Sequence, residues 1–127
     1  MGTATEPTDL MAQASNPTLA ALTAESFRPY VNTIFEFRGI AADGSVASSG
    51  AELELMEVNT PSDGSRNRDP RWRQPFSLLF VMRGGSLSAN GLCRMTHNAF
   101  ATSDLFLSRV DVRSRPFTQP YYEAVFG

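Results

Sequence analysis

Apolar and polar residues alternate along much of the chain after residue 32, which is the period of a β-strand with one buried face. In the first such segment, Thr33–Arg38, Phe35 and Phe37 share one face. In the second segment, Glu52–Val58, Leu53 and Leu55 share one face, and the alternation then slips at Met56. A slip of one residue within a strand is typical of a β-bulge, so we predict a bulge there.

Four further segments complete a set of about six predicted strands. They are Phe76–Met82, Leu92–His97, residues 105–112 and Tyr121–Phe126. The first of these is apolar on both faces, which indicates a central strand covered on both sides. Leu107 and Val110 have opposite parity, so we expect a second bulge near Ser108 and Arg109.

Turn and cap signals separate these segments. Thr23 is a suitable N-cap for a short helix at Thr23–Phe27, and Pro29 is expected to end that helix. Residues 42–45 (Ala-Asp-Gly-Ser) predict a turn of the kind that joins hairpin strands, and Gly84-Gly85 predicts another turn.

These elements predict an all-β fold with a single antiparallel domain over residues 22–127. The domain is either a sandwich or a small, partly closed barrel of about six strands, preceded by the short helix. Residues 1–21 are polar, contain prolines and show no sustained periodicity, so we expect them to form a flexible N-terminal tail. Closure of the sheet or pairing with a partner would protect its edge strands.

The composition fits a globular protein and excludes several classes. The chain has 127 residues, which fits one domain, and 42% of them are hydrophobic. No apolar run approaches the ~20 residues that span a bilayer, and the start lacks the basic and apolar regions of a signal peptide. We expect cytoplasmic synthesis and no membrane partner, with later incorporation into an extracellular or tail-like assembly left open.

The net charge is only −2, but it is unevenly distributed. Residues 1–65 hold nine acids and two arginines, whereas residues 66–115 hold nine arginines and three acids. Such polarity could orient subunits or favour an acidic partner.

An arginine-rich loop is the first candidate contact surface. Residues 59–74 are rich in Pro, Gly, Asp and Arg, and the candidate contact residues are Arg66, Arg68, Arg71, Trp72 and Arg73. Arginines beside an aromatic ring can bind nucleic acid, but the acidic pI near 5.3 argues against this. We expect a solvated loop or a protein contact, because Trp and Arg are enriched at interface hot spots. Tyr121 and Phe126 join the contact residues if the terminal strand is an edge.

His97 is the only histidine and the one side chain whose ordinary pKa lies near neutrality. As a catalytic base it would need a nucleophile and an orienting acid. No known motif frames Ser86, Ser88, Ser103 or Asp104 for those roles. We expect instead a structural histidine at a strand end that bonds its own loop.

The other candidate chemistry is weaker. Cys93 shares a strand face with Met95 and is expected to be a buried, unreactive thiol. One Cys and one His give no metal-ligand spacing, and Gly84-Gly85 lacks the frame of a phosphate-binding loop. Glu52 and Glu54 are expected to face solvent. We therefore predict no catalytic residue, no metal and no cofactor.

Five short motifs occur in order along the chain. They are LTAESF at Leu22–Phe27, RQPFSLLF at Arg73–Phe80, GLCRMTH at Gly91–His97, LFL at Leu105–Leu107 and YEAVF at Tyr122–Phe126. Together they resemble an uncharacterised family of small bacterial β domains, a domain of unknown function. The match covers residues 22–127. The chain departs from the family pattern at Gly84-Gly85, where a Gly-Pro turn is expected, and in its longer arginine-rich loop.

The resemblance implies a small β domain encoded near phage-tail-collar-like or other tail-derived proteins, with no catalytic residues assigned. We therefore predict a non-enzymatic structural or interaction protein, an accessory component of a phage-tail-like or fibrous assembly, with a protein partner or self-assembly. The alternative is a small ligand-binding β-barrel with a pocket lined by Phe35, Phe37, Phe80 and Tyr122. The third hypothesis is a hydrolase centred on His97.

Overall fold

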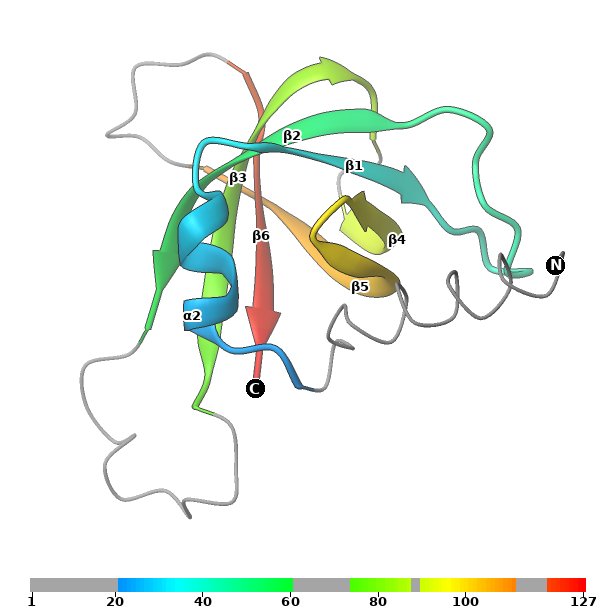
Figure 1. Cartoon of the computed structure of the whole chain (residues 1–127). Helices are drawn as coiled ribbons and strands as arrows, with labels where there is room; N and C mark the ends of the chain where they lie inside the picture. Colours follow the sequence, from blue (N-terminus) through cyan, green and yellow to red (C-terminus); the bar gives the residue numbers. More distant parts are fainter. Residues whose placement is uncertain (1–20, 61–73, 88–89, 112–118) are drawn as a thin grey trace, which may run out of the picture.

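Six antiparallel strands close into a barrel in the order β1-β2-β3-β6-β5-β4 (Figure 1). The computed structural model describes residues 21–60, 74–87, 90–111 and 119–127. Within these residues the strands are β1 (Ile34–Gly39), β2 (Ala51–Asn59), β3 (Phe76–Gly85), β4 (Asn90–His97), β5 (Phe100–Val110) and β6 (Tyr121–Phe126). The predicted all-β domain is confirmed, and of the two architectures considered the structure has the barrel. The predicted tail, apart from Ala21, lies outside the described residues.

Helix α2 (Ala24–Phe27) precedes the barrel, as predicted. Thr23 is its N-cap, and the Thr23 backbone N–H donates a hydrogen bond to the Ser26 hydroxyl at 3.0 Å. The chain then tightens into the 3-10 helix η2 (Arg28–Tyr30), which contains Pro29. Proline has no backbone N–H and cannot extend an α-helix, so the α-helical segment stays one turn long.

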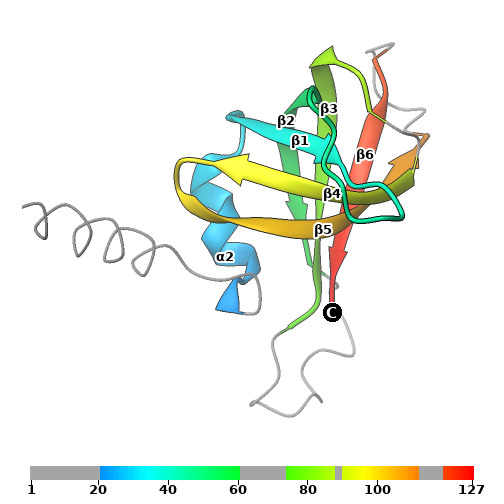
Figure 2. The ribbon, with the colours of Figure 1, turned by 90° about the vertical axis from the view of Figure 1, so that its right-hand side faces the viewer.

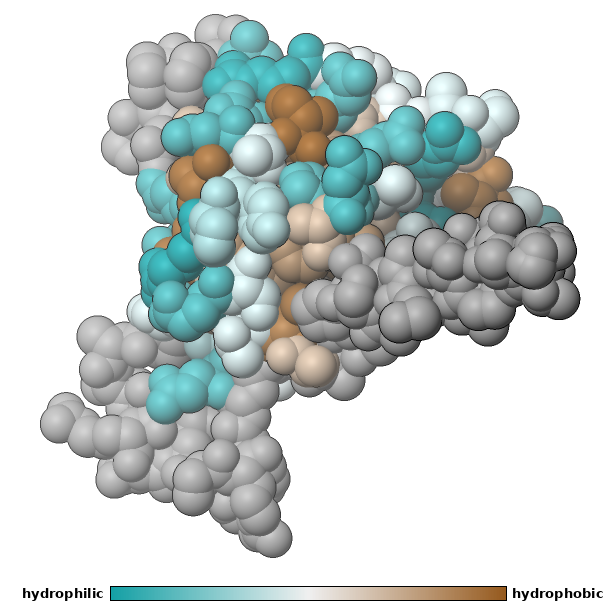
Figure 3. Space-filling model, viewed as in Figure 1, coloured by the Kyte–Doolittle hydropathy of each residue, from teal (hydrophilic) through white to brown (hydrophobic). Residues whose placement is uncertain are grey.

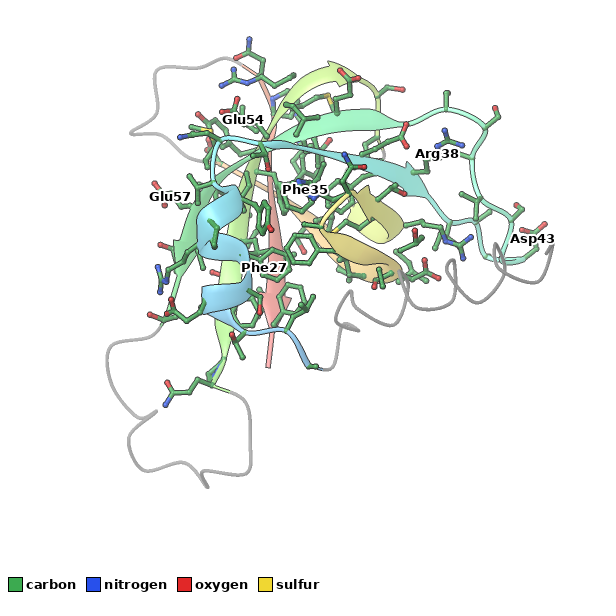
Figure 4. The ribbon with its side chains drawn as sticks, viewed as in Figure 1. Phe27, Phe35, Arg38, Asp43, Glu54 and Glu57 are labelled. Carbon is green, nitrogen blue, oxygen red and sulfur yellow. The ribbon has the colours of Figure 1, made fainter. Side chains whose placement is uncertain are left out.

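Phe27 fills a gap between two strands at one end of the barrel. β5 and β6 pair only where Ser108–Val110 meets Tyr121–Glu123, and they separate beyond that point. The Phe27 ring stacks on the ring of Phe100 with centroids 4.6 Å apart and lies 5.8 Å from the ring of Phe126. Figure 4 shows Phe27 directed toward the strands from α2. The helix therefore completes the hydrophobic core where the β5–β6 ladder is missing.

The barrel interior is packed with aromatic and aliphatic side chains. Phe35 and Phe37 point inward from β1, and both are fully buried, as their parity predicts. Leu53 and Leu55 are likewise buried on β2, and the register shift between Leu55 and Glu57 confirms the bulge predicted at Met56.

The prediction that β3 is covered on both faces is also confirmed. Phe76, Leu78 and Phe80 belong to the barrel core. Leu79 and Val81 point the other way, yet they are buried in a second cluster on the outer wall. That outer cluster also contains Tyr121 and the partly buried Met56 and Val110.

Two local predictions are wrong. No register shift occurs near Ser108 and Arg109, because Val110 keeps the outward parity of its strand and packs in the outer cluster. The shift on this side of the sheet lies instead between Met95 and His97.

Gly84-Gly85 is not a turn. Both residues belong to β3 and pair with Glu52 and Ala51 of β2. Gly85 has a φ of 75°, and a Cβ there would collide with the backbone of Gly50. Glycine is needed at this position because the two backbones meet too closely for a side chain.

The turn predicted at residues 42–45 joins β1 to β2, as expected. The Asp43 carboxylate accepts hydrogen bonds from the Ser45 backbone N–H at 2.9 Å and from the Ser45 hydroxyl at 2.7 Å. These bonds lower the pKa of Asp43 below its ordinary value because they favour the charged form. Gly44 supplies the left-handed conformation of the turn, with a φ of 90°.

Candidate interaction surface

The contact residues predicted from the sequence fall into two groups. Arg66, Arg68, Arg71, Trp72 and Arg73 lie outside the described residues. Tyr121 and Phe126 are described, and both are buried. β6 pairs with β3 along its length and with β5 from Tyr121 to Glu123. Both side chains are buried in the described structure, so neither is available to a partner strand.

The interior pocket of the alternative hypothesis is absent at the four residues proposed to line it. Phe35, Phe37, Phe80 and Tyr122 are almost completely buried by other side chains. The Phe80 ring lies edge-on to Phe35 and Phe37, with centroids 5.4 Å and 5.1 Å apart. These rings fill the space that a ligand would need, so an interior ligand site at these residues has no structural basis.

His97 lies at the end of β4 and makes hydrogen bonds through both ring nitrogens. Nδ1 accepts from the backbone N–H of Ala99 at 3.0 Å, and Nε2 lies 3.1 Å from the Thr33 hydroxyl. The Thr33 hydroxyl donates to the carbonyl oxygen of Tyr30 at 2.6 Å, so it accepts from Nε2–H. These bonds fix a neutral imidazole that ties the β4–β5 turn to the segment after η2.

The predicted bond of His97 to its own loop is confirmed by the contact with Ala99, and the ring is packed among aromatic side chains. The ring packs against Phe35, with centroids 4.1 Å apart, and edge-on to Tyr30 at 5.3 Å. Burial lowers the pKa of His97 below 6.5, because the apolar surroundings disfavour the imidazolium. In the described chain the hydrogen-bond partners of the ring are Thr33 and Ala99, and neither is the Ser or Asp that a hydrolytic site would need.

Cys93 is the buried thiol that the sequence predicts. It is almost fully buried on β4, and its thiol contacts the carbonyl oxygen of Gly91 at 3.7 Å. Burial raises the pKa of Cys93 above its ordinary value, which keeps the thiol protonated and a weak nucleophile.

The acidic residues of β2 lie on the outer face, as predicted. Glu52 is exposed, and Glu54 forms an ion pair with Arg83 at 2.7 Å across the β2–β3 ladder. Within the described ranges, no three His, Cys, Asp or Glu side chains gather closely enough to hold a metal ion.

A row of apolar side chains lies on the outer wall instead, and the sequence analysis missed it. Leu92 of β4 and Phe106 of β5 are directly opposite each other, and they are 46% and 58% exposed. Ile40 continues the row, since its backbone N–H donates to the carbonyl oxygen of Leu92 at 2.9 Å. We call Ile40, Leu92 and Phe106 the outer-wall row. Such a contiguous row differs from scattered exposed residues and is a feature of interaction surfaces.

Charged residues border the outer-wall row on one side. Arg94 and Asp104 are the next outward pair along β4 and β5, and Arg94 Nε donates to Asp104 at 2.8 Å. This pairing raises the pKa of Arg94 and lowers that of Asp104, since each charge stabilises the other. Arg38 of β1 lies opposite Arg94 and contacts Glu36 at 3.5 Å.

A cleft lies beside the row. It has a volume of about 290 Å3 and is lined by Gly39–Ala41, Ser45–Ala47 and Gly91–Cys93. Leu92 therefore belongs to both the outer-wall row and the cleft. On the face that carries α2, Figure 3 shows apolar residues in small separate areas among polar ones. An apolar row bordered by charges and by a cleft can receive a protruding side chain of another protein.

The sequence did contain a signal for this surface. Leu92 and Phe106 lie at positions of polar parity: Leu92 precedes the buried Cys93, and Phe106 lies between the buried Leu105 and Leu107. A large apolar residue at an outward position of a one-sided strand is unexpected. These two residues indicate a contact surface only because the β4–β5 register places them opposite each other.

The family described as domain of unknown function DUF6916 matches residues 22–126, which is most of the chain. The chain belongs to the DUF6916 family. The expectation of an uncharacterised domain family is thereby confirmed, while the link to tail-collar-like proteins stays a prediction. The start of the DUF6916 match, Leu22–Phe27, contributes Leu22, Ala24 and Phe27 to the barrel core.

No curated protein and no solved structure matches the chain. None of the helices in the described part has the length and apolar character needed to cross a membrane. The outer-wall row is the candidate interaction surface of this DUF6916 barrel.

Proposed function

We propose that this domain is a non-enzymatic interaction domain that acts as an accessory component of a larger phage-tail-like or fibrous assembly. One observation carries the proposal: the domain exposes Leu92 and Phe106 side by side on the outer wall of a barrel whose interior is filled. Leaving such a row in water is unfavourable, and contact with another protein would remove it from solvent.

The distribution of reactive groups supports a binding role. Both ring nitrogens of His97 are engaged in holding the turn, and the Cys93 thiol is buried. The ion pairs Arg94–Asp104 and Arg83–Glu54 lie on the outer wall and balance charge there. Groups arranged in this way stabilise the barrel and orient a partner rather than activate a substrate.

The assembly itself is proposed from the sequence resemblance, which connects this kind of domain with tail-derived proteins. A small closed barrel suits such a role, because closure limits uncontrolled strand pairing while the outer wall stays available. The cleft beside Leu92 would hold one anchoring side chain of the partner, and the charged border would set its orientation.

Co-expression with the proteins encoded beside this gene tests the proposal. The wild-type chain should co-purify with a tail-collar-like partner, and Leu92→Lys should abolish the interaction. Ile34→Lys is the matched control, because Ile34 is a similar residue, 47% exposed, on another part of the wall. A wild-type chain that co-purifies with none of these proteins contradicts the proposal, as does a Leu92→Lys variant that binds as well as Ile34→Lys.

A further inference from the structure

The unpaired edge of β5 is the second unusual feature of this barrel. β4 pairs with β5 from Phe100 to Ser108, but β6 pairs with β5 only from Ser108 to Val110. Within the described residues, the β6-facing edge of β5 from Ala101 to Leu107 has no ladder partner. Figure 2 shows β5 as the outer strand of the β1–β4–β5 sheet over most of its length. Its backbone groups are therefore free to accept another strand.

The sequence of this edge lacks the residues that normally prevent strand addition. The segment Ala101–Leu107 contains no proline, glycine, lysine or arginine, and Asp104 is its only charged residue. Asp104 is already neutralised by Arg94, at 2.8 Å and 3.2 Å through two guanidinium nitrogens. A strand that approaches the edge meets no uncompensated charge.

Exposed apolar side chains lie where the β5–β6 ladder stops. Phe106 and Val125 are each two residues beyond Ser108 and Glu123, the last pair of that ladder. They are 58% and 72% exposed, the highest values among the large hydrophobic residues of the described chain. An added strand would cover the Phe106 side of this site while it bonds to the backbone of β5.

We propose that the free edge of β5 pairs antiparallel with the β5 edge of a second copy of this chain. This inference goes beyond the proposed function, although both use Phe106, whose ring a second copy or the tail-like partner would cover. Two copies related by a two-fold axis present the same neutral edge to each other, so each supplies the backbone groups that the other lacks.

The charge pattern of the edge favours a second copy over a charged partner. In a register centred on Leu105, Asp104 of one copy lies opposite Phe106 of the other, and the two carboxylates do not face each other. Since each Asp104 keeps its own Arg94, the pairing leaves no unbalanced charge at the interface. The outward Phe106 rings move next to the other copy and lose solvent exposure.

Sedimentation velocity of the full chain over a range of concentrations tests the inference. The wild type should form a dimer, and Phe106→Ser should weaken dimerisation about tenfold or more, as expected when an aromatic anchor is lost. Ile34→Ser, which alters an exposed residue of β1 with 47% exposure, should dimerise like the wild type. A wild type that stays monomeric at all concentrations overturns the inference, as does a Phe106→Ser variant that dimerises normally.

NMR on a mixed sample of labelled and unlabelled chains tests the strand pairing directly. Intermolecular contacts between backbone protons of Ala101–Leu107 in the two copies are expected. A dimer whose intermolecular contacts all lie outside β5 refutes the inference. A monomer that still binds its tail-like partner refutes self-pairing and leaves the proposed function intact. A β5-paired dimer that binds no such partner supports self-pairing and refutes the proposed function.

Discussion

Replacing Phe27 by alanine should destabilise the barrel more than any change on its outer wall. Phe27 is fully buried, and its ring lies within 6.4 Å of the rings of Phe35, Phe76, Phe100 and Phe126. Truncating a buried phenylalanine costs about 3–5 kcal/mol. We expect about 3 kcal/mol here, at the lower end of that range, because a one-turn helix can shift inward and refill part of the cavity.

Urea unfolding followed by circular dichroism measures this cost. With a dependence of about 2 kcal/mol per molar urea, a loss of 3 kcal/mol lowers the midpoint by about 1.5 M. Phe106→Ala is the matched control: the same residue type, 58% exposed, should cost less than about 1 kcal/mol at protein concentrations that favour the monomer. If Phe27→Ala costs no more than Phe106→Ala, the view that α2 closes the gap between β5 and β6 is wrong.

Three further predictions concern single residues. Burial lowers the pKa of His97, so the unfolded state binds more protons, and stability should decline as the pH falls through 6.5 toward the lower, folded-state pKa. Urea unfolding at several pH values should show a smaller decline for His97→Asn than for the wild type. The His97→Asn variant should still assemble with its partner. Cys93 should react with iodoacetamide roughly tenfold or more slowly in the native protein than in urea, because burial keeps its thiol protonated and inaccessible; equal rates would contradict the buried position. Gly85→Ala should cost about 2 kcal/mol owing to its positive φ and the nearby Gly50 backbone, whereas Gly39→Ala, which meets open space, should be nearly neutral in the same unfolding assay.

Side-chain parity made much of the barrel predictable. The inward positions of Phe35 and Phe37, and the bulge after Leu55, follow from alternation because a strand buries every second residue on one side. The short helix could be predicted because Thr23 has the chemistry of an N-cap. These are local signals, and each was read within a few residues.

Properties that depend on how distant strands meet could not be predicted in this way. Val110 is an apolar residue at an outward position of β5, where it packs in the outer cluster with Tyr121 of β6. From alternation alone, an apolar residue at that position looks like a bulge. Gly84-Gly85 has the composition of a turn, but its close contact with Gly50 is set by a strand from another part of the sequence. No sequence signal indicates the early end of the β5–β6 ladder.

The candidate contact surface also depends on how distant strands meet, so it could not be predicted from local patterns. Leu92 and Phe106 are fourteen positions apart in the sequence, and their exposure becomes a surface feature only through the β4–β5 register. The predicted contacts at Tyr121 and Phe126 assumed a terminal edge strand, whereas closure of the barrel buries both side chains. The arginine-rich loop stays a prediction.

Hydrogen–deuterium exchange of the wild-type chain, free and in a purified assembly with its partner, tests the central claim most directly. That claim is that the domain acts through its outer wall and not through its interior. Assembly should slow exchange in Gly91–Cys93 and in the neighbouring segment that supplies Gly39–Ala41 and Ser45–Ala47, since both line the cleft beside the outer-wall row. Unchanged exchange in both segments, with protection confined to other parts of the chain, would contradict the claim.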